Sequence, residues 1–301
     1  MTRVLPFSDD AIAQAAELIG SGEPVAIATE TVYGLAADAT NAAAVARIYE
    51  AKGRPSFNPL IVHVPDLAAA QRIGEFGPEA LELAGKHWPG PLTLVVRLKA
   101  DAGIASLVTA GLPTIALRVP GHRAMQALLH ATGKPLAAPS ANASGLISPT
   151  RAKHVLKSLG GKIPLIVDDG PCERGIESTI VAAAGGALRL LRPGPIAIDA
   201  APSPSGSSES PGQLPSHYAP SKPLRINIVN ADSGEFHLGF GVVPGDVSLS
   251  RSGDLTEAAA RLFDLLHQGD ASSQPRIAVA PVPDEGLGAA INDRLSRAAR
   301  A

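Results

Sequence analysis

Four polar side chains that can bind anions or transfer protons lie in one short connector of this 301-residue chain. The stretch IYEAKGRPSFNPLIVHV, residues 48–64, contains Lys52, Arg54, Asn58 and His63, with one glycine and two prolines between them. One interpretation is a helix C-terminus, where cations lie near the negative end of the dipole and glycine ends the helix. The other is a rigid cradle for a negatively charged ligand.

Two apolar segments that are expected to be strands also carry basic groups. In TIALRV, residues 114–119, the period of two places Arg118 on the face opposite Leu117. In LIVHV, residues 60–64, His63 shares a face with Ile61. A solvated outer face of the sheet would explain Arg118 as well as a binding role, and a satisfied core histidine is the simpler explanation of His63 alone.

Further hydroxyl, amide and basic groups follow other apolar segments. The run APSANASGLISP, residues 138–149, is rich in serine and asparagine, Ser178 begins a strand-like segment, and Arg192 ends another. Each is explained by a turn, or by donors aimed at a ligand at the carboxyl end of a strand. Their joint occurrence favours a binding site.

Composition and missing motifs exclude several classes of protein. The formal net charge of -2 argues against strong nucleic-acid binding, and the single cysteine, Cys172, excludes an intrachain disulfide and any CxxC motif. The chain has no P-loop, GxGxxG fingerprint, HExxH or GxSxG. No secretory signal and no apolar run of about 20 residues is found, so we expect a cytoplasmic protein that does not contact the membrane.

The order of apolar segments predicts an α/β fold with a mixed sheet. Helices are expected after Ser8 and near Asn41, Pro78, His122 and Pro149. Neighbouring strands within 178–192 leave no room for a crossover, so they are expected to be antiparallel. Strands are expected at residues 24–29, 60–64, 92–98, 114–119, 135–140, 164–169, 178–183 and 187–192.

Serine, proline and glycine divide the chain into a large and a small unit. Residues 1–200 form the large unit, 201–223 a linker, and 224–301 a small α/β unit. The small unit is expected to have strands at 224–229 and 276–280 and helices at 254–268 and from 287 to 300. His217 and Tyr218 in the linker are explained by composition alone as a small aromatic anchor.

Eight of these segments together resemble the threonylcarbamoyl-AMP synthases, which are built on a YrdC-like domain. The match runs in order from residue 8 to residue 220, with Ala28 and Ala36 as small departures, and the C-terminal tail is similar to the small domain of the two-domain members. The segments are TETVYGLAADA (29–39), KGRPSFNPLIVHV (52–64), WPGPLTLVV (88–96), TIALRVPGH (114–122), PSANASG (139–145), ESTIV (177–181), LRPGPI (191–196) and HYAP (217–220).

The resemblance implies an open, twisted, mixed parallel and antiparallel sheet with a second, smaller Rossmann-like domain. It implies a nucleotidyltransferase that joins L-threonine, bicarbonate and ATP into threonylcarbamoyl-AMP and pyrophosphate. Mg²⁺ would come with ATP, with no metal held by the protein and no redox cofactor. A separate transferase complex would then modify tRNA next to the anticodon, with at most a weak tRNA contact by this chain.

The resemblance also assigns roles to residues, with the linker folded over the active site as a lid. Lys52 and Arg54 would be catalytic, acting on the reacting anions. Threonine would be held by Thr31, His63, Arg118, the backbone of Ala138, and Ser178. ATP would be held by Arg54, Asn58, Thr114, Ser140, Ser148, Arg192 and Tyr218.

Two alternatives remain open from the residues alone. The first is a tRNA- or double-stranded-RNA-binding module without catalysis, which the local cluster around Lys52 and Arg54 permits. The second is a carbamoyl transferase of hydrogenase maturation, which uses a related domain together with cysteine-rich zinc segments. The single cysteine does not fit the second alternative.

Overall fold

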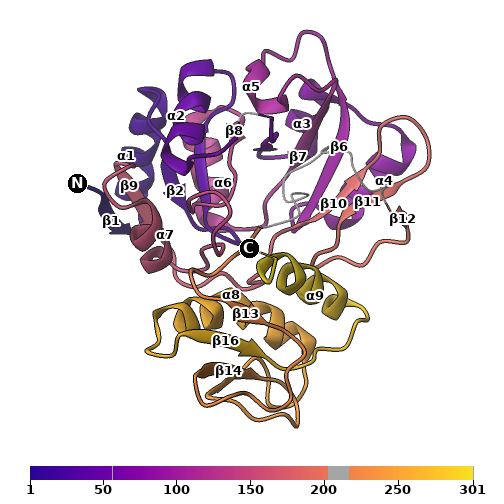
Figure 1. The fold of residues 1–301 in the computed structure, drawn as a ribbon. Helices are drawn as coiled ribbons and strands as arrows, with labels where there is room; N and C mark the ends of the chain where they lie inside the picture. The colour runs from indigo at the N-terminus through magenta and orange to yellow at the C-terminus, as the bar shows by residue number, and fades with distance from the viewer. Residues whose placement is uncertain (56, 203–216, 301) are drawn as a thin grey trace.

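The computed structural model describes residues 1–55, 57–202 and 217–300 and contains two sheets (Figure 1). The larger sheet has twelve strands and the smaller has four. In Figure 1 the smaller sheet lies below the larger one, with helices between them. Among the described residues, no helix is long and apolar enough to cross a membrane.

The larger sheet and its helices are built from residues 1–202. Its helices are α1 (Asp9–Gly20), α2 (Ala42–Lys52), α3 (Leu67–Ile73), α4 (Pro78–His87), α5 (Ser106–Thr109), α6 (Arg123–Thr132) and α7 (Ala152–Leu159). Its strands are β1 (Arg3–Pro6), β2 (Val25–Ile27), β3 (Gly34–Asp38), β4 (Ile61–His63), β5 (Gly74–Glu75), β6 (Leu92–Leu98), β7 (Thr114–Arg118), β8 (Leu136–Ala137), β9 (Leu165–Asp168), β10 (Thr179–Ala182), β11 (Arg189–Arg192) and β12 (Ala201–Pro202).

The sheet is open and mixed, which confirms the predicted fold class. The strand order is β1-β9-β2-β3-β8-β4-β7-β6-β10-β11-β12, and β5 pairs with β6. Strand β4 runs parallel to β7, and β6 runs antiparallel to β7. Strands β10 and β11 are antiparallel, as their short connection predicted.

Most predicted helices begin where a capping side chain is available. The Ser8 side chain accepts a hydrogen bond from Ala11 N, and the Asn41 side chain accepts from Ala43 N and Ala44 N. His122 caps α6 in the same way. The helix expected near Pro149 begins at Ala152.

Helices cover the two halves of the large sheet unevenly. Helices α1 and α6 pack on β2, β3, β8 and β9, in one cluster of buried apolar residues. A second, larger cluster includes α2, α3, α4 and α7 together with Leu92, Leu94 and Leu117 on one face of the central strands. The opposite face of those strands carries a small cluster that contains strand residues alone: Ile61, Val95, Ala116, Ile180, Ala182 and Leu191. That face is therefore available for a site.

The smaller sheet is parallel and has the Rossmann-like character that was predicted. Its order is β13-β16-β14-β15, from β13 (Leu224–Arg225), β14 (Glu235–Gly239), β15 (Val247–Ser248) and β16 (Arg276–Val279). Helices α8 (Leu255–Ala271) and α9 (Leu287–Ala298) accompany it. The strand predicted at 224–229 was wrong beyond Arg225, because Asn227 has a φ of 60°, which no strand residue adopts.

The smaller unit docks on the larger one through α8 and α9, which lie between the two sheets in Figure 1. Their apolar residues form one buried cluster with Val32, Ile147 and Ile176 of the larger unit. Most of the predicted linker, residues 203–216, lies outside the described residues. Its described part includes β12 at one end and His217 and Tyr218 at the other.

Candidate active site

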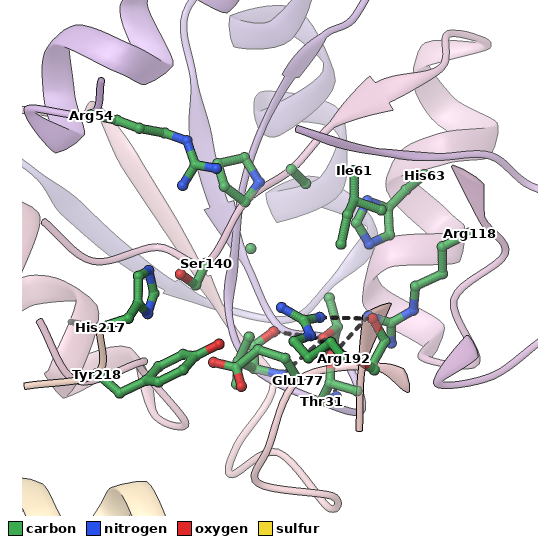
Figure 2. Close-up of a pocket in the computed structure, with 16 residues that line it drawn as sticks. Thr31, Arg54, Ile61, His63, Arg118, Ser140, Glu177, Arg192, His217 and Tyr218 are labelled. Carbon is green, nitrogen blue, oxygen red and sulfur yellow. Dashed lines mark hydrogen bonds between the residues drawn. The ribbon is translucent and has the colours of Figure 1, made fainter. Parts of the chain in front are cut away.

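One cavity collects polar side chains from the central strands, the loops beside them and the segment before the small sheet (Figure 2). Three of the four predicted cations, Arg54, Arg118 and Arg192, line it together. The predicted site residues on its wall are Thr31, Arg54, His63, Arg118, Ala138, Ser140, Ser178, Arg192 and Tyr218. Nine of the predicted site residues therefore share one cavity, and the roles assigned to them stay predictions.

Strand register places the first pair of polar side chains. Strands β4 and β7 are parallel, with His63 opposite Arg118 and Ile61 opposite Ala116. His63 and Arg118 thus lie on the same side of the central strands as Ile61 and Ala116, opposite the cluster that contains α2, α3, α4 and α7. Arg118 is only 3% exposed, so a solvated outer face is the wrong explanation of this residue.

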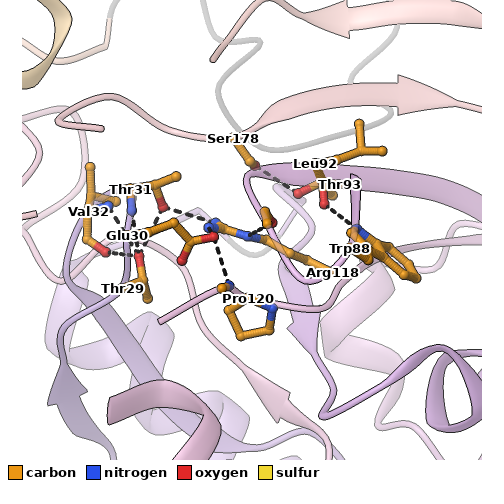
Figure 3. Close-up of polar contacts among 12 residues, drawn as sticks. Thr29, Glu30, Thr31, Val32, Trp88, Leu92, Thr93, Arg118, Pro120 and Ser178 are labelled. Carbon is orange, nitrogen blue, oxygen red and sulfur yellow. Dashed lines mark hydrogen bonds and ion pairs between the residues drawn. The ribbon is translucent and has the colours of Figure 1, made fainter. Parts of the chain in front are cut away.

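A tight turn after β2 brings a carboxylate to Arg118 (Figure 3). Thr29 Oγ1 accepts hydrogen bonds from Thr31 N and Val32 N, which fixes the turn. Arg118 Nη2 pairs with Glu30 Oε1 at 2.6 Å, and Arg118 Nη1 donates to Thr31 Oγ1 at 3.0 Å. Burial raises the pKa of Glu30, but Arg118 and the backbone hydrogen bond from Gly121 together outweigh burial and the net pKa is lowered, so this carboxylate is ionised.

Arg192 is held by the strand next to its own. Its Nε donates to Ser178 O and its Nη2 to Ser178 Oγ, both at 3.1 Å. Ser178 Oγ in turn lies 2.8 Å from Thr93 Oγ1 on β6. Among the described residues, no carboxylate forms an ion pair with Arg192, so its charge is available to an anionic ligand.

The connector after α2 ends the helix, as the first interpretation predicts, and it also places Arg54 on the cavity wall, which the second interpretation requires. Gly53 has a φ of 58° and ends α2 in the left-handed conformation that glycine tolerates. Beyond it, Arg54 Nε donates to Asn58 O at 3.2 Å and Nη2 to Pro59 O at 2.9 Å. Burial lowers the pKa of Arg54 to about 10, although Tyr49 opposes this change, so the guanidinium remains charged at neutral pH.

Two histidines on the cavity wall are neutral. Burial, and then the neighbouring Arg118, lowers the pKa of His63 to about 3, and burial lowers that of His217 to a similar value. The Nδ1 atoms of both rings are buried and have no hydrogen-bond partner among the described residues. Each ring therefore offers hydrogen bonds to a ligand without adding charge.

Four predicted site residues do not line the cavity. Lys52 lies behind its wall, where Nζ donates to Ser140 O at 2.5 Å and also to Asn142 O. Ser148 Oγ donates to Glu177 Oε1 at 2.5 Å. Thr114 begins β7, roughly 13 Å along the strand from Arg118.

Asn58 is the fourth, and its side chain is unusual. Both amide atoms, Oδ1 and Nδ2, are buried and have no hydrogen-bond partner among the described residues. A buried amide without partners is costly, which fits a group that a ligand completes. The roles predicted for these four residues stay predictions.

Glu177 is a charged residue of the cavity wall that sequence reasoning missed. It lies in the ESTIV segment, but a carboxylate was not expected among arginines that bind anions. Ile61 and Thr29 were also missed, although both lie in segments that were singled out. Period two did place Ile61 beside His63. The other unpredicted lining residues are Val32, Gly34, Pro139 and His217.

The cavity is suited to substrates with several negative charges. Arg118 is already paired with Glu30, while Arg54 and Arg192 contact only neutral oxygens of the described residues. Planar guanidinium groups bind carboxylate and phosphate oxygens in pairs. No group of three or more metal-ligating side chains occurs in the described part of the chain.

The fold and the site define an α/β protein with a buried, arginine-lined cavity for anionic substrates. The Sua5/YciO/YrdC family model, described as "Telomere recombination", matches residues 17–194. The model "Threonylcarbamoyl-AMP synthase, C-terminal domain" matches residues 190–300. The chain belongs to the Sua5/YciO/YrdC family, in its two-domain form.

Two relatives align over nearly the whole chain. The threonylcarbamoyl-AMP synthase of Bacillus subtilis is 42% identical, and the alignment covers 99% of this chain and 96% of the relative. That of Pyrococcus abyssi is 37% identical, over 94% and 92%. The crystal structure of P. abyssi Sua5 with L-threonine superimposes with a TM-score of 0.91 at 33% identity, over 99% of this chain and 98% of that one.

Proposed function

We propose that this chain is an L-threonylcarbamoyladenylate synthase, which condenses L-threonine, bicarbonate and ATP. Relatives of that name align over nearly its full length, and a structural neighbour was crystallised with L-threonine. The observation that carries the proposal is the cavity in which Arg54, Arg118 and Arg192 meet. Three mutually repelling anions need such a concentration of fixed positive charge.

The chemistry has two steps. The neutral amine of threonine attacks the carbon of bicarbonate, a C–N bond forms, and water is lost to give a carbamate. A carbamate oxygen then attacks the α-phosphorus of ATP, a P–O bond forms, and the bond to the β-phosphate breaks to release pyrophosphate. The described residues of the cavity wall include no nucleophile paired with a base for covalent catalysis, and positioning and charge stabilisation supply the rate enhancement in this proposal.

The site divides into two sides in this proposal. Thr31, His63, Arg118, the backbone of Ala138 and Ser178 hold threonine. ATP, with its Mg²⁺, is held by Arg54, Asn58, Thr114, Ser140, Ser148, Arg192 and Tyr218. Arg54 also offsets the charge of the reacting groups, and Lys52 acts from behind the wall by fixing the carbonyls of Ser140 and Asn142.

The biological setting is part of the same proposal. Threonylcarbamoyl-AMP is a reactive mixed anhydride, so a transferase complex in the cytoplasm is expected to consume it in modifying tRNA next to the anticodon. The three ranges 1–200, 201–223 and 224–301 serve as catalytic unit, lid and small α/β unit. Tyr218 on the cavity wall fits the lid, whose residues 203–216 lie outside the described ones.

A pyrophosphate-release assay tests this function. Purified protein with ATP should release pyrophosphate only when L-threonine and bicarbonate are both present, and the product should contain the carbon of labelled bicarbonate. Omitting bicarbonate or replacing L-threonine by L-serine are the matched controls. Equal release with L-serine would refute the threonine assignment, and salt-sensitive RNA binding that ignores ATP and threonine would favour the RNA-binding alternative.

A further inference from the structure

Helix α9 of the small unit places one fully buried arginine against the wall of the cavity. Arg294 is 0% exposed, and its Nε donates to Glu177 Oε2 at 3.0 Å. Its Nη1 donates to Asp293 Oδ2 at 2.9 Å. Glu177 itself lines the cavity, so a residue of the small unit lies one side chain away from the proposed substrates.

Glu177 is held from both sides. While Oε2 accepts from Arg294, Oε1 accepts from Ser148 Oγ at 2.5 Å. Burial by itself would raise the pKa of Glu177, but Arg294, and then Arg192, outweigh it and the net pKa is lowered. The carboxylate is therefore charged and fixed, and it stays so because an arginine from the other unit pairs with it.

Tyr218 is the second residue of the cavity wall that contacts Arg294. The guanidinium carbon of Arg294 lies 5.5 Å from the centroid of the Tyr218 ring, and Phe263 of α8 stacks on this ring at 5.6 Å. The backbone of Tyr218 has a φ of 66°, an unfavourable conformation for tyrosine that surrounding contacts must maintain. Its phenol, which has no hydrogen-bond partner among the described residues, points toward the cavity (Figure 2).

The loop that leads to Glu177 is pressed against the same unit. A β-carbon at Gly175 would lie 2.4 Å from the carbonyl oxygens of Ala259 and Ala260 on α8. Only glycine allows this approach, and its φ of 68° favours glycine as well. The position of the small unit and the position of Glu177 are thus mechanically linked.

We propose that Arg294 is a positioning residue for the ATP side of the cavity. It holds the Glu177 carboxylate and the Tyr218 ring in place, so that this side is complete only when the small unit is docked. The inference rests on the proposed function and gives the small unit a role in it. The threonine side, around Arg118 and Thr31, has no hydrogen bond or ion pair with α9 among the described residues, and only the apolar side chain of Val32 in that turn packs in the cluster of the small unit.

Steady-state kinetics of four variants test the proposal. Arg294→Met keeps volume but removes the donors, Arg294→Lys keeps one charged donor, and Glu177→Gln with Arg294→Met removes both partners of the buried pair. Arg300→Met, an exposed arginine near the end of the chain, is the matched control. For each variant the melting temperature, kcat, KM for ATP and KM for L-threonine are measured.

We expect Arg294→Met to raise KM for ATP about tenfold or more and to change KM for L-threonine less than twofold. Arg294→Lys should fall between this variant and wild type. The double variant should recover melting temperature, because it leaves no unpaired buried carboxylate, but should keep the raised KM for ATP. Arg300→Met should match wild type in all four quantities.

Several outcomes would overturn the proposal. A double variant that regains both stability and wild-type KM for ATP would mean that Arg294 only supports the fold. Equal increases in KM for ATP and KM for L-threonine would mean that Arg294 does not act specifically on the ATP side of the cavity. If Arg294→Met does not fold, the melting temperatures and KM values of Arg294→Lys and of the double variant test the proposal by the same criteria.

Failure of the proposed function is a separate result. It would be seen as absence of threonine- and bicarbonate-dependent pyrophosphate release by the wild-type protein. In that case, calorimetric titration with ATP still tests Arg294: Arg294→Met should weaken ATP binding about tenfold, and unchanged binding would refute the positioning role.

Discussion

The two sides of the cavity are built in different ways. The side around Arg118 comes from neighbouring strands and one turn of the larger unit, and its charges are neutralised internally by Glu30. The side around Glu177 and Tyr218 is assembled from loops and is held by Arg294 of the smaller unit. One side of the cavity is thus positioned mainly by strand register, while polar contacts of a docked second unit position the other.

Arg118→Met should lower activity and stability more than the other substitutions. If it does not, the contrast between the two sides of the cavity is wrong. Arg118→Met leaves the buried Glu30 without its partner, so we expect an activity loss of about a thousandfold or more and a loss of about 3–5 kcal/mol in the free energy of unfolding. Adding Glu30→Gln should restore most of the stability and none of the activity. Chemical denaturation and pyrophosphate release measure the two effects, and a stable, active single variant would refute the assignment.

Loss of Arg192 should separate activity from stability. Arg192→Met removes hydrogen bonds to Ser178 but breaks no ion pair among the described residues. We expect about a hundredfold lower activity and a loss of only about 1–2 kcal/mol in the free energy of unfolding. If its cost in stability equals that of Arg118→Met under the same conditions, the contrast between a paired and an available arginine is wrong.

Lys52 should act mainly through the loop that it holds. Lys52→Met leaves the carbonyls of Ser140 and Asn142 without their shared donor, so we expect a loss of about 2 kcal/mol in the free energy of unfolding together with reduced activity. Thermal unfolding and steady-state kinetics of Lys52→Met check this expectation. Lost activity with unchanged stability would instead place Lys52 in direct contact with the substrates, as the resemblance implies.

His63 and His217 predict that the free energy of unfolding depends on pH, with an effect smaller than those of the substitutions above. His63 and His217 have pKa values lowered from 6.5 to about 3, so the unfolded chain binds more protons between these values and stability falls as pH falls. Each should contribute a loss of about 0.7 kcal/mol between pH 7 and pH 6. Denaturation curves at both pH values measure it, and His63→Gln and His217→Gln should each flatten the dependence by that amount. An unchanged slope in either variant would mean that its histidine is not held neutral.

Local signals singled out Arg54, His63, Arg118, Ser178 and Arg192, which lie at strand ends and in one connector, while the roles of the site residues came from the resemblance. Period two placed Arg118 opposite Leu117 and His63 on one face with Ile61, and Gly53 marked the end of α2. Glu177 could not be predicted in this way, since its charge is stabilised by Arg294, 117 residues further along the chain. The strand β3 was missed because GLAAD lacks the β-branched and aromatic residues that mark strands, and tertiary pairing overrides that preference.

The amino-acid sequence by itself determined the α/β class, the antiparallel pair β10 and β11, the caps of the helices and the set of basic residues that could meet, because these depend on contacts within a few residues. Only the tertiary structure decided that Arg54, Arg118 and Arg192 share one cavity while Lys52 stands behind it, and that the small unit supplies Arg294 to its wall. The physical reason is that burial and long-range pairing set which charges are neutralised and which remain available to a ligand, and neither is a local property of the chain.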